Sequence, residues 1–192
     1  LPLLYVFTLL VFLWAILHPQ RITAEQIAHA YLGAITIPFL LSGVMRILLQ
    51  HENGKVYVLL PFLAAWCSDS LALVFGMLFG KHKLIPQVSP KKTVEGAVGG
   101  VIGAVAGLCI FGYFAGNKLG VEPNYLLLSA AGVVGSLAGM LGDLALSLVK
   151  RKTGIKDYGR IMPGHGGVLD RFDSVIFAAP VTWMLVNAAT LY

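Results

Sequence analysis

Residues 147–173 read SLVKRKTGIKDYGRIMPGHGGVLDRFD and lie between two apolar stretches, 125–149 and 174–192. A helix that crosses a bilayer needs about 20 apolar residues, and each stretch is close to that length or longer. The segment between them carries bases, a glycine-rich turn and two carboxylates three residues apart, at the boundary between hydrocarbon and water. That inventory suits the binding of a polyanion through a metal ion.

The composition of the whole chain is that of a membrane protein. Hydrophobic residues make up 57% of its 192 residues and charged residues 12%, and the mean hydropathy is +0.80. Soluble domains carry about 25% charged residues, so the composition indicates an integral membrane protein. The net charge of +5 does not indicate a nucleic-acid partner, because the positive charge is concentrated in particular loops.

The apolar pattern predicts an all-α fold, a polytopic transmembrane bundle of about six spanning helices with a polar cavity on the cytoplasmic side. We expect residues 1–192 to form a single integral-membrane catalytic domain. Because Leu1 already lies inside an apolar run, we also expect helices upstream of it. Thr23 and Gln26 fit a capping box that would begin the second helix. The apolar segments are 1–17, 27–49, 56–80, 95–116, 125–149 and 174–192.

The bases predict the orientation of the bundle. Loops one, three and five share one face, and with their flanks they hold eleven of the fourteen Lys and Arg residues. Only Arg46, Lys55 and Lys118 lie near the other face. Loops rich in Lys and Arg stay in the cytoplasm, so we expect these loops there and both chain ends opposite.

Two aspartates lie inside apolar segments. A central Asp costs about 2.5–3.5 kcal/mol on insertion scales, and such residues usually mark a functional interior. Asp143 precedes Ser147 by one helical turn, so their side chains share a face. The alternative for Asp143 is an ion pair with a basic loop residue. For Asp69 the alternative is a hydrogen bond to a Ser or Thr of another helix.

Asp170 and Asp173 stand at the entrance to the last apolar segment, with Arg171 between them. A helix N-terminus favours negative charge, so these residues could simply cap the helix. With Asp143 they also form a set of hard oxygen donors suited to Mg²⁺, which takes few carboxylates and leaves sites for substrate phosphates. Asp69 would line the same cavity or hold a second cation.

Residues 80–96 read GKHKLIPQVSPKKTVEG. Ser89 and Thr93 end where the fourth apolar segment begins, and a helix start can bind a phosphate through its N–H groups. Lys91 and Lys92 would neutralise that phosphate. The alternative is that these bases attract lipid headgroups and set the topology.

The turn at residues 163–167 reads PGHGG. Gly166 and its neighbours permit positive φ and close approach of the backbone to a ligand. Cys67 and Cys109 have no partner at zinc-site spacing, so we expect them to be small buried hydrophobes. His165 is accordingly expected to position the loop or to contact a phosphate.

Both polar stretches resemble characteristic motifs of the phosphatidate cytidylyltransferases (CDP-diacylglycerol synthases). The motifs are S-x2-K-R-x4-K-D-x-G-x3-P-G-H-G-G-x2-D-R-x-D and G-K-(H/R)-K-L-x-P-x-(I/V)-S-P-K-K-T-x-E-G, and the resemblance covers roughly residues 66–100 and 139–174. It implies transfer of CMP from CTP to phosphatidate in the bacterial cytoplasmic membrane, with the active site facing the cytoplasm and CDP-diacylglycerol and pyrophosphate as products. Membrane lipids are then partners. Glycines recur at three- and four-residue spacing in the fourth and fifth apolar segments, and small residues let helices approach closely in lipid. We expect these helix faces to be packing faces, and they permit a homodimer.

With this resemblance we assign Asp143, Asp170 and Asp173, with Lys150, to catalysis. The three carboxylates, with Asp69, are the expected ligands of Mg²⁺ and of any second cation. The residues expected to bind substrate are Ser89, Lys91, Lys92, Thr93, Ser147, Arg151, His165, Gly166 and Arg171.

Other functions remain open at this point. An ion-coupled transporter would also use buried acids and glycine-interrupted helices, although the acids here cluster with bases at one membrane face and no paired half-repeats are evident. A non-catalytic receptor for anionic lipid would explain the basic loops but not the three clustered aspartates. The helix motif of the CDP-alcohol phosphotransferases, D-G-x2-A-R-x8-G-x3-D-x3-D, is absent.

Overall fold

The computed structural model describes residues 2–51, 53–119, 122–159 and 166–188. The chain divides into two compact units, Leu1–Leu40 and Leu41–Tyr192. We call them unit 1 and unit 2 and describe each by itself.

Unit 1 holds α1 (Pro2–Leu17), α2 (Ala24–Tyr31), a π-helical turn η1 (Leu32–Thr36) and the start of α3 (Ile37–Gln50). The predicted capping box is confirmed. Thr23 Oγ1 accepts from the Gln26 N–H at 3.2 Å, and Gln26 Oε1 accepts from the Thr23 N–H at 3.0 Å. The rings of Phe7 and Tyr31 meet edge to face, 5.6 Å between centroids, and join α1 to α2.

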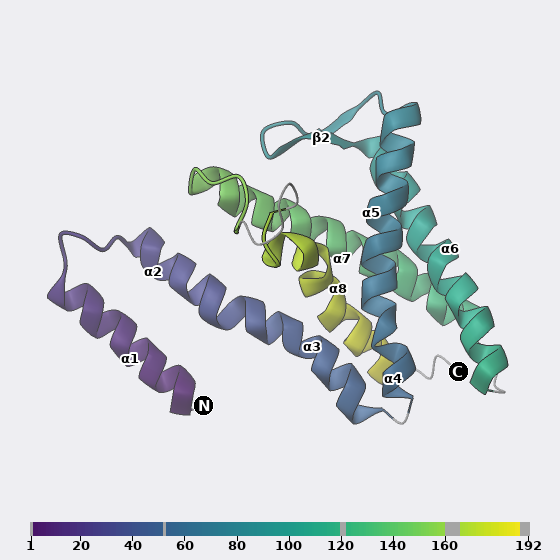
Figure 1. Cartoon of the computed structure of the whole chain (residues 1–192), viewed down its shortest axis with the longest axis horizontal. Helices are drawn as coiled ribbons and strands as arrows, with labels where there is room; N and C mark the ends of the chain where they lie inside the picture. The colour runs from purple at the N-terminus through teal and green to yellow at the C-terminus, as the bar shows by residue number, and fades with distance from the viewer. Residues whose placement is uncertain (1, 52, 120–121, 160–165, 189–192) are drawn as a thin grey trace. The chain divides into compact units, whose positions relative to one another are not determined.

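Unit 2 is a helical bundle with one short hairpin. After the end of α3 come α4 (Gly54–Tyr57), α5 (Leu59–Phe79), β1 (Lys83–Ile85), β2 (Ser89–Thr93), α6 (Val94–Leu119), α7 (Tyr125–Lys152) and α8 (Leu169–Ala188). Helices α5, α6, α7 and α8 pack against one another (Figure 1). Their shared core includes Leu60, Leu108, Leu128, Ala131 and Val186.

Glycines let these helices approach closely, as predicted. A Cβ on Gly132 of α7 would lie 2.8 Å from the Val105 Cα of α6, and one on Gly142 would lie 2.7 Å from the Asp173 carbonyl oxygen of α8. A Cβ on Gly103 of α6 would lie 2.7 Å from the Cys67 carbonyl oxygen of α5. Close backbone approach drives helix association in lipid. Since these faces pack inside one chain, they give no separate support to a homodimer, which stays a prediction.

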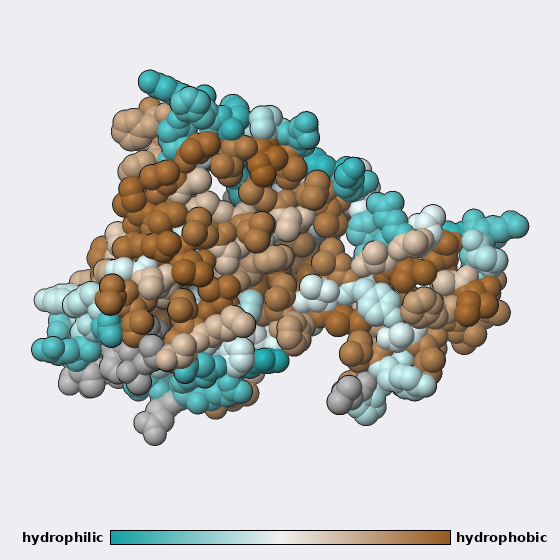
Figure 2. Space-filling view, turned by 180° about the vertical axis from the view of Figure 1, so that it is seen from behind, coloured by the Kyte–Doolittle hydropathy of each residue, from teal (hydrophilic) through white to brown (hydrophobic). Residues whose placement is uncertain are grey.

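Four helical stretches of the described residues are long and apolar enough to span a membrane: Ala24–Gln50, Gly54–Phe79, Val94–Lys118 and Tyr125–Lys152. Figure 2 shows the flank of unit 2 as apolar between hydrophilic ends, and its exposed side chains include Trp66, Leu73 and Leu141. An all-α integral membrane protein is therefore confirmed. About six spans stays a prediction, because α1 has only 16 residues and α8 begins with three charged residues in its first five.

Two details differ from the sequence expectation. The stretch between the third and fourth segments forms an antiparallel hairpin, in which Lys83 pairs with Thr93 and Ile85 with Ser89. Its two prolines disfavour a helix there, and a hydrogen bond of 2.6 Å between His82 Nδ1 and Glu95 Oε1 fastens it to α6. Helix α7 continues to Lys152 instead of ending at 149, because Lys and Arg are good helix formers and stabilise a helix C-terminus.

Candidate active site

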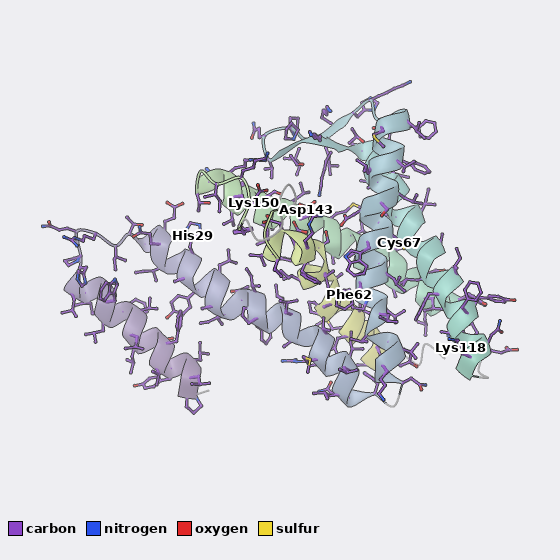
Figure 3. The ribbon with its side chains drawn as sticks, viewed as in Figure 1. His29, Phe62, Cys67, Lys118, Asp143 and Lys150 are labelled. Atoms are coloured by element: carbon purple, nitrogen blue, oxygen red, sulfur yellow. The ribbon has the colours of Figure 1, made fainter. Side chains whose placement is uncertain are left out.

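The polar segments gather at one end of unit 2. Figure 1 shows the β1–β2 hairpin, the C-terminal end of α7 and the N-terminal end of α8 on one side, with the turn between α3 and α4 on the other. In Figure 3, Asp143 and Lys150 lie toward the first of these sides, and Lys118 lies at the far end of α6. Loops three and five, two of the three loops predicted to share a face, therefore lie at the same end of unit 2.

A cavity of ≈ 630 Å³ opens between the hairpin and helices α5, α6 and α7. Its polar lining includes Asp69, Lys91, Lys92, Thr93 and Asp143. Five of the residues singled out from the sequence, taken from two separate blocks, thus surround one space.

Two residues of the cavity lining form an ion pair. Lys92 Nζ of β2 contacts Asp143 Oδ2 of α7, and about a quarter of each side chain is exposed, 27% and 25%. Ser147 Oγ donates to Asp143 Oδ1 at 3.2 Å, which confirms that Asp143 and Ser147 share a helix face. The ion pair considered as the alternative role for Asp143 is therefore present.

Ser174 of α8 links Asp69 of α5 to Asp173 of its own helix. Its hydroxyl donates to Asp69 Oδ2 at 3.1 Å, and its N–H donates to Asp173 Oδ1 at 2.8 Å. Asp69, Asp143 and Asp173 lie close enough to repel one another electrostatically. Among the residues that the structure describes, no group of three or more His, Cys, Asp or Glu side chains is arranged to hold a metal ion.

Asp170 accepts three hydrogen bonds. Lys150 Nζ donates to its Oδ1 at 2.8 Å, while the N–H groups of Tyr158 and Gly167 donate to its Oδ2 at 2.8 and 2.9 Å. Burial alone would raise the pKa of Asp170, but these bonds outweigh it and hold that pKa below its ordinary value. Asp170 therefore ties the loop after α7 to the start of α8, and its role as a metal ligand stays a prediction.

Loop three supplies a helix cap and three cavity-lining bases, Lys83, Lys91 and Lys92. Thr93 is buried, and its Oγ1 accepts from the Gly96 N–H at 3.1 Å, so it caps the start of α6. Ser89 is half-buried in β2 opposite Ile85. Lys91 is exposed beside the cavity. The role of Ser89 and Thr93 in binding substrate stays a prediction.

Several other predicted residues lie at the same end but not in the cavity lining. Gly166 adopts φ +81°, and a Cβ there would lie 3.1 Å from Asp170 Oδ2, so its glycine is needed locally. Arg151 is exposed on the last turn of α7, and Arg171 is exposed on the first turn of α8. His165 lies outside the described residues.

Sequence reasoning missed Ser174 and Tyr158. Ser174 meets Asp69 across 105 positions of the chain, and the Tyr158 hydroxyl donates to the Leu146 carbonyl oxygen at 3.0 Å across 12 positions. Ser174 had one available signal, its place directly after Asp173. Tyr158 had none, because the cytidylyltransferase motif leaves its position open.

Comparison with known proteins identifies the family of this chain. The model of the cytidylyltransferase family matches residues 2–189. The phosphatidate cytidylyltransferase of Staphylococcus haemolyticus is 43% identical over 144 residues, which are 75% of this chain and 54% of that protein. The one from Staphylococcus saprophyticus is 42% identical over 152 residues, 79% of this chain and 57% of that protein. The chain thus spans little more than half the length of these relatives. Its match to the family model nevertheless covers nearly every residue, and the chain belongs to the cytidylyltransferase family.

Proposed function

We propose that this chain transfers CMP from CTP to phosphatidate, giving CDP-diacylglycerol and pyrophosphate for phospholipid synthesis. The relatives named phosphatidate cytidylyltransferase support this reaction. The observation that carries it is the Lys92–Asp143 ion pair, beside Asp69 and Asp173, at the cavity of an otherwise apolar bundle. A polar site of this kind suits one soluble polyanion and one lipid-anchored phosphate.

The reaction requires little proton transfer. A phosphate oxygen of phosphatidate attacks the α-phosphorus of CTP and forms a P–O bond, while the bond to the bridging oxygen breaks and pyrophosphate leaves with its electron pair. A phosphate monoester is largely ionised at neutral pH, so no strong base is needed. The protein must mainly position the phosphates and offset their charge.

The bases of two elements would bind these phosphates. Lys91 and Lys92 of β2 line the cavity, and Lys150 lies near enough to Asp173 to interact with its charge. We propose that Lys92 leaves or shares Asp143 when a phosphate enters. The remaining proposed contacts are Ser89, Thr93, Ser147, Arg151, His165, Gly166 and Arg171.

The donor chemistry of the carboxylates fits Mg²⁺. Asp69, Asp143 and Asp173 present hard oxygens from three helices and repel one another, and Mg²⁺ prefers such ligands. Among the described residues, Asp69 and Asp173 form no ion pair. When bound, Mg²⁺ would offset charge on the phosphate oxygens. Asp143 and Asp173 would hold the ion, and Asp69 would bind it or a second cation. Asp170, which also holds Lys150, stays a predicted further ligand.

The topology proposed with this function has six spans, with the hairpin and the α7–α8 loop in the cytoplasm of a bacterial cell. The positive-inside rule supports this orientation. CTP would then reach the site from the cytoplasm and phosphatidate from the inner leaflet. A homodimer is a separate prediction.

The test is incorporation of label from α-³²P-CTP into lipid by the purified chain with phosphatidate in detergent micelles. We expect labelled lipid that requires phosphatidate and disappears with EDTA. Asp143→Asn and Asp173→Asn should each abolish labelling while circular dichroism stays unchanged, whereas Lys118→Gln at the far end should retain it. A folded wild-type chain that yields no labelled lipid refutes the proposal. Ion flux in vesicles would then favour a transporter, and binding of phosphatidate alone a receptor.

A further inference from the structure

Tyr158 contacts three parts of the site through three different groups. Its N–H donates to Asp170 Oδ2 at 2.8 Å, and its hydroxyl donates to the Leu146 carbonyl oxygen of α7 at 3.0 Å. The ammonium group of Lys150 lies 5.4 Å from the centroid of its ring, within the range of a cation–π contact. One side chain therefore spans the gap between α7 and the loop that follows it.

These contacts confine Lys150. Asp170 Oδ1 holds the ammonium group at 2.8 Å, the Tyr158 ring lies near it, and only 11% of the lysine side chain is exposed. The two partners are themselves joined, because the Tyr158 N–H binds the other oxygen of Asp170. Loss of the ring would remove one of the groups that confine the Lys150 ammonium group and give it more freedom to move.

The loop around Tyr158 is built to keep this arrangement. Gly159 and Gly167 pack backbone to backbone, since a Cβ on Gly167 would lie 2.7 Å from the Gly159 nitrogen. Burial, and then the charges of Asp170 and Asp173, raise the pKa of the Tyr158 hydroxyl, so it stays protonated as the donor to α7. The tyrosine is thus anchored at both its backbone and its hydroxyl.

We infer that Tyr158 is a positioning residue that holds the Lys150 ammonium group against Asp170, aimed at the phosphates of the proposed reaction. The inference rests on the proposed function for its catalytic consequence, but the confinement of Lys150 can be measured without it. The family motif leaves this position open, so the assignment comes from contacts alone.

The first measurement is the acetylation rate of Lys150 in the purified chain, followed by mass spectrometry. The exposed Lys152 and Lys156 serve as internal references. We expect wild-type Lys150 to react more slowly than both. Tyr158→Leu should raise its rate about tenfold, as loss of a cation–π contact predicts, while Tyr158→Phe, which keeps the ring, should change it less than about threefold.

The matched control is Tyr113→Leu, the same change at an exposed tyrosine of α6, which should leave the Lys150 rate unaltered. If Lys150 of the wild type reacts as fast as Lys152, or if Tyr158→Leu leaves its rate unchanged, the inference is overturned. If Tyr158→Leu does not fold, Tyr158→Phe tests the inference instead. A tenfold rise in the acetylation rate of Lys150 in Tyr158→Phe would mean that the ring does not hold the lysine.

The second measurement separates positioning from a general structural role. With CMP transfer as the assay, Tyr158→Leu should lower kcat about tenfold with KM for phosphatidate nearly unchanged, and Tyr158→Phe should restore most of kcat. A rise in KM alone would overturn the positioning role. If the wild type transfers no CMP, the proposed function fails, while the acetylation result still decides whether Tyr158 confines Lys150.

Discussion

Replacing Asp170 with Asn removes the negative charge from a carboxylate that accepts three hydrogen bonds. The substitution keeps the shape of the side chain, so packing changes little. An amide offers one oxygen where the carboxylate offered two, and its NH₂ group would face either Lys150 or the N–H groups of Tyr158 and Gly167. At least one donor then loses its acceptor.

The expected cost follows from burial. Only 11% of the Lys150 side chain and 8% of the Asp170 side chain are exposed. Removing one partner of a buried ion pair costs roughly 3–5 kcal/mol, because the other charge is left uncompensated. Residual solvent contact favours the lower figure, so we expect Asp170→Asn to lower the free energy of unfolding by about 3 kcal/mol.

The assay is unfolding in mixed micelles of dodecylmaltoside and increasing SDS, followed by circular dichroism. The matched control is Asp157→Asn in the same loop, where the side chain is exposed and the expected change is within about 0.5 kcal/mol. A loss below about 1 kcal/mol for Asp170→Asn would refute the view that this carboxylate holds the loop.

Three further outcomes are expected. The stability difference between wild type and Asp170→Asn should shrink as the pH falls below about 3.9, the pKa of an unfolded Asp, because a carboxyl whose pKa is lowered by folding stabilises only while ionised; a constant difference from pH 7 to 2 in SDS titrations would contradict this. Gly142→Ala should destabilise by about 1–3 kcal/mol because its Cβ would lie 2.7 Å from a backbone oxygen of α8. The same change at Gly33, which has nothing within 4 Å of a Cβ, should be neutral or stabilising by up to about 1 kcal/mol in the same titration. Lys92→Gln should raise KM for CTP about tenfold with unchanged membrane insertion, measured by initial rates and by protease accessibility; altered topology with unchanged KM would show that the base only orients the chain.

Some features of the site followed directly from local spacing. Asp143 and Ser147 are one turn apart, so any helix brings them together, and the observed hydrogen bond of 3.2 Å agrees. The capping box of Thr23 and Gln26 is likewise a matter of three residues along the chain. The glycine spacing of the fourth and fifth segments predicted packing faces, which the contacts of Gly103 and Gly132 confirm.

Other features could not be predicted because they depend on which elements meet. Nothing in the order of residues distinguishes Lys92 from Lys91 as the partner of Asp143. That choice depends on the hairpin, whose strand alternates the two side chains. Asp170 and Asp173 looked like an equivalent pair, yet the loop donates two N–H groups to the first, while the second lies among the aspartates of α5 and α7.

The sequence alone determined that this chain is an apolar helical protein whose charged residues gather in two polar segments. Composition and helical periodicity are local properties. Apolar segments partition into lipid and charged segments into water whatever distant contacts the chain makes. Only the tertiary structure decided which two of the four aspartates pair with lysines, Asp143 with Lys92 at the cavity and Asp170 with Lys150 at the start of α8. A charge in a low-dielectric interior is stabilised by whichever opposite charge lies within about 4 Å, and that neighbour is set by helix packing, here by glycines that bring α5, α6, α7 and α8 close together.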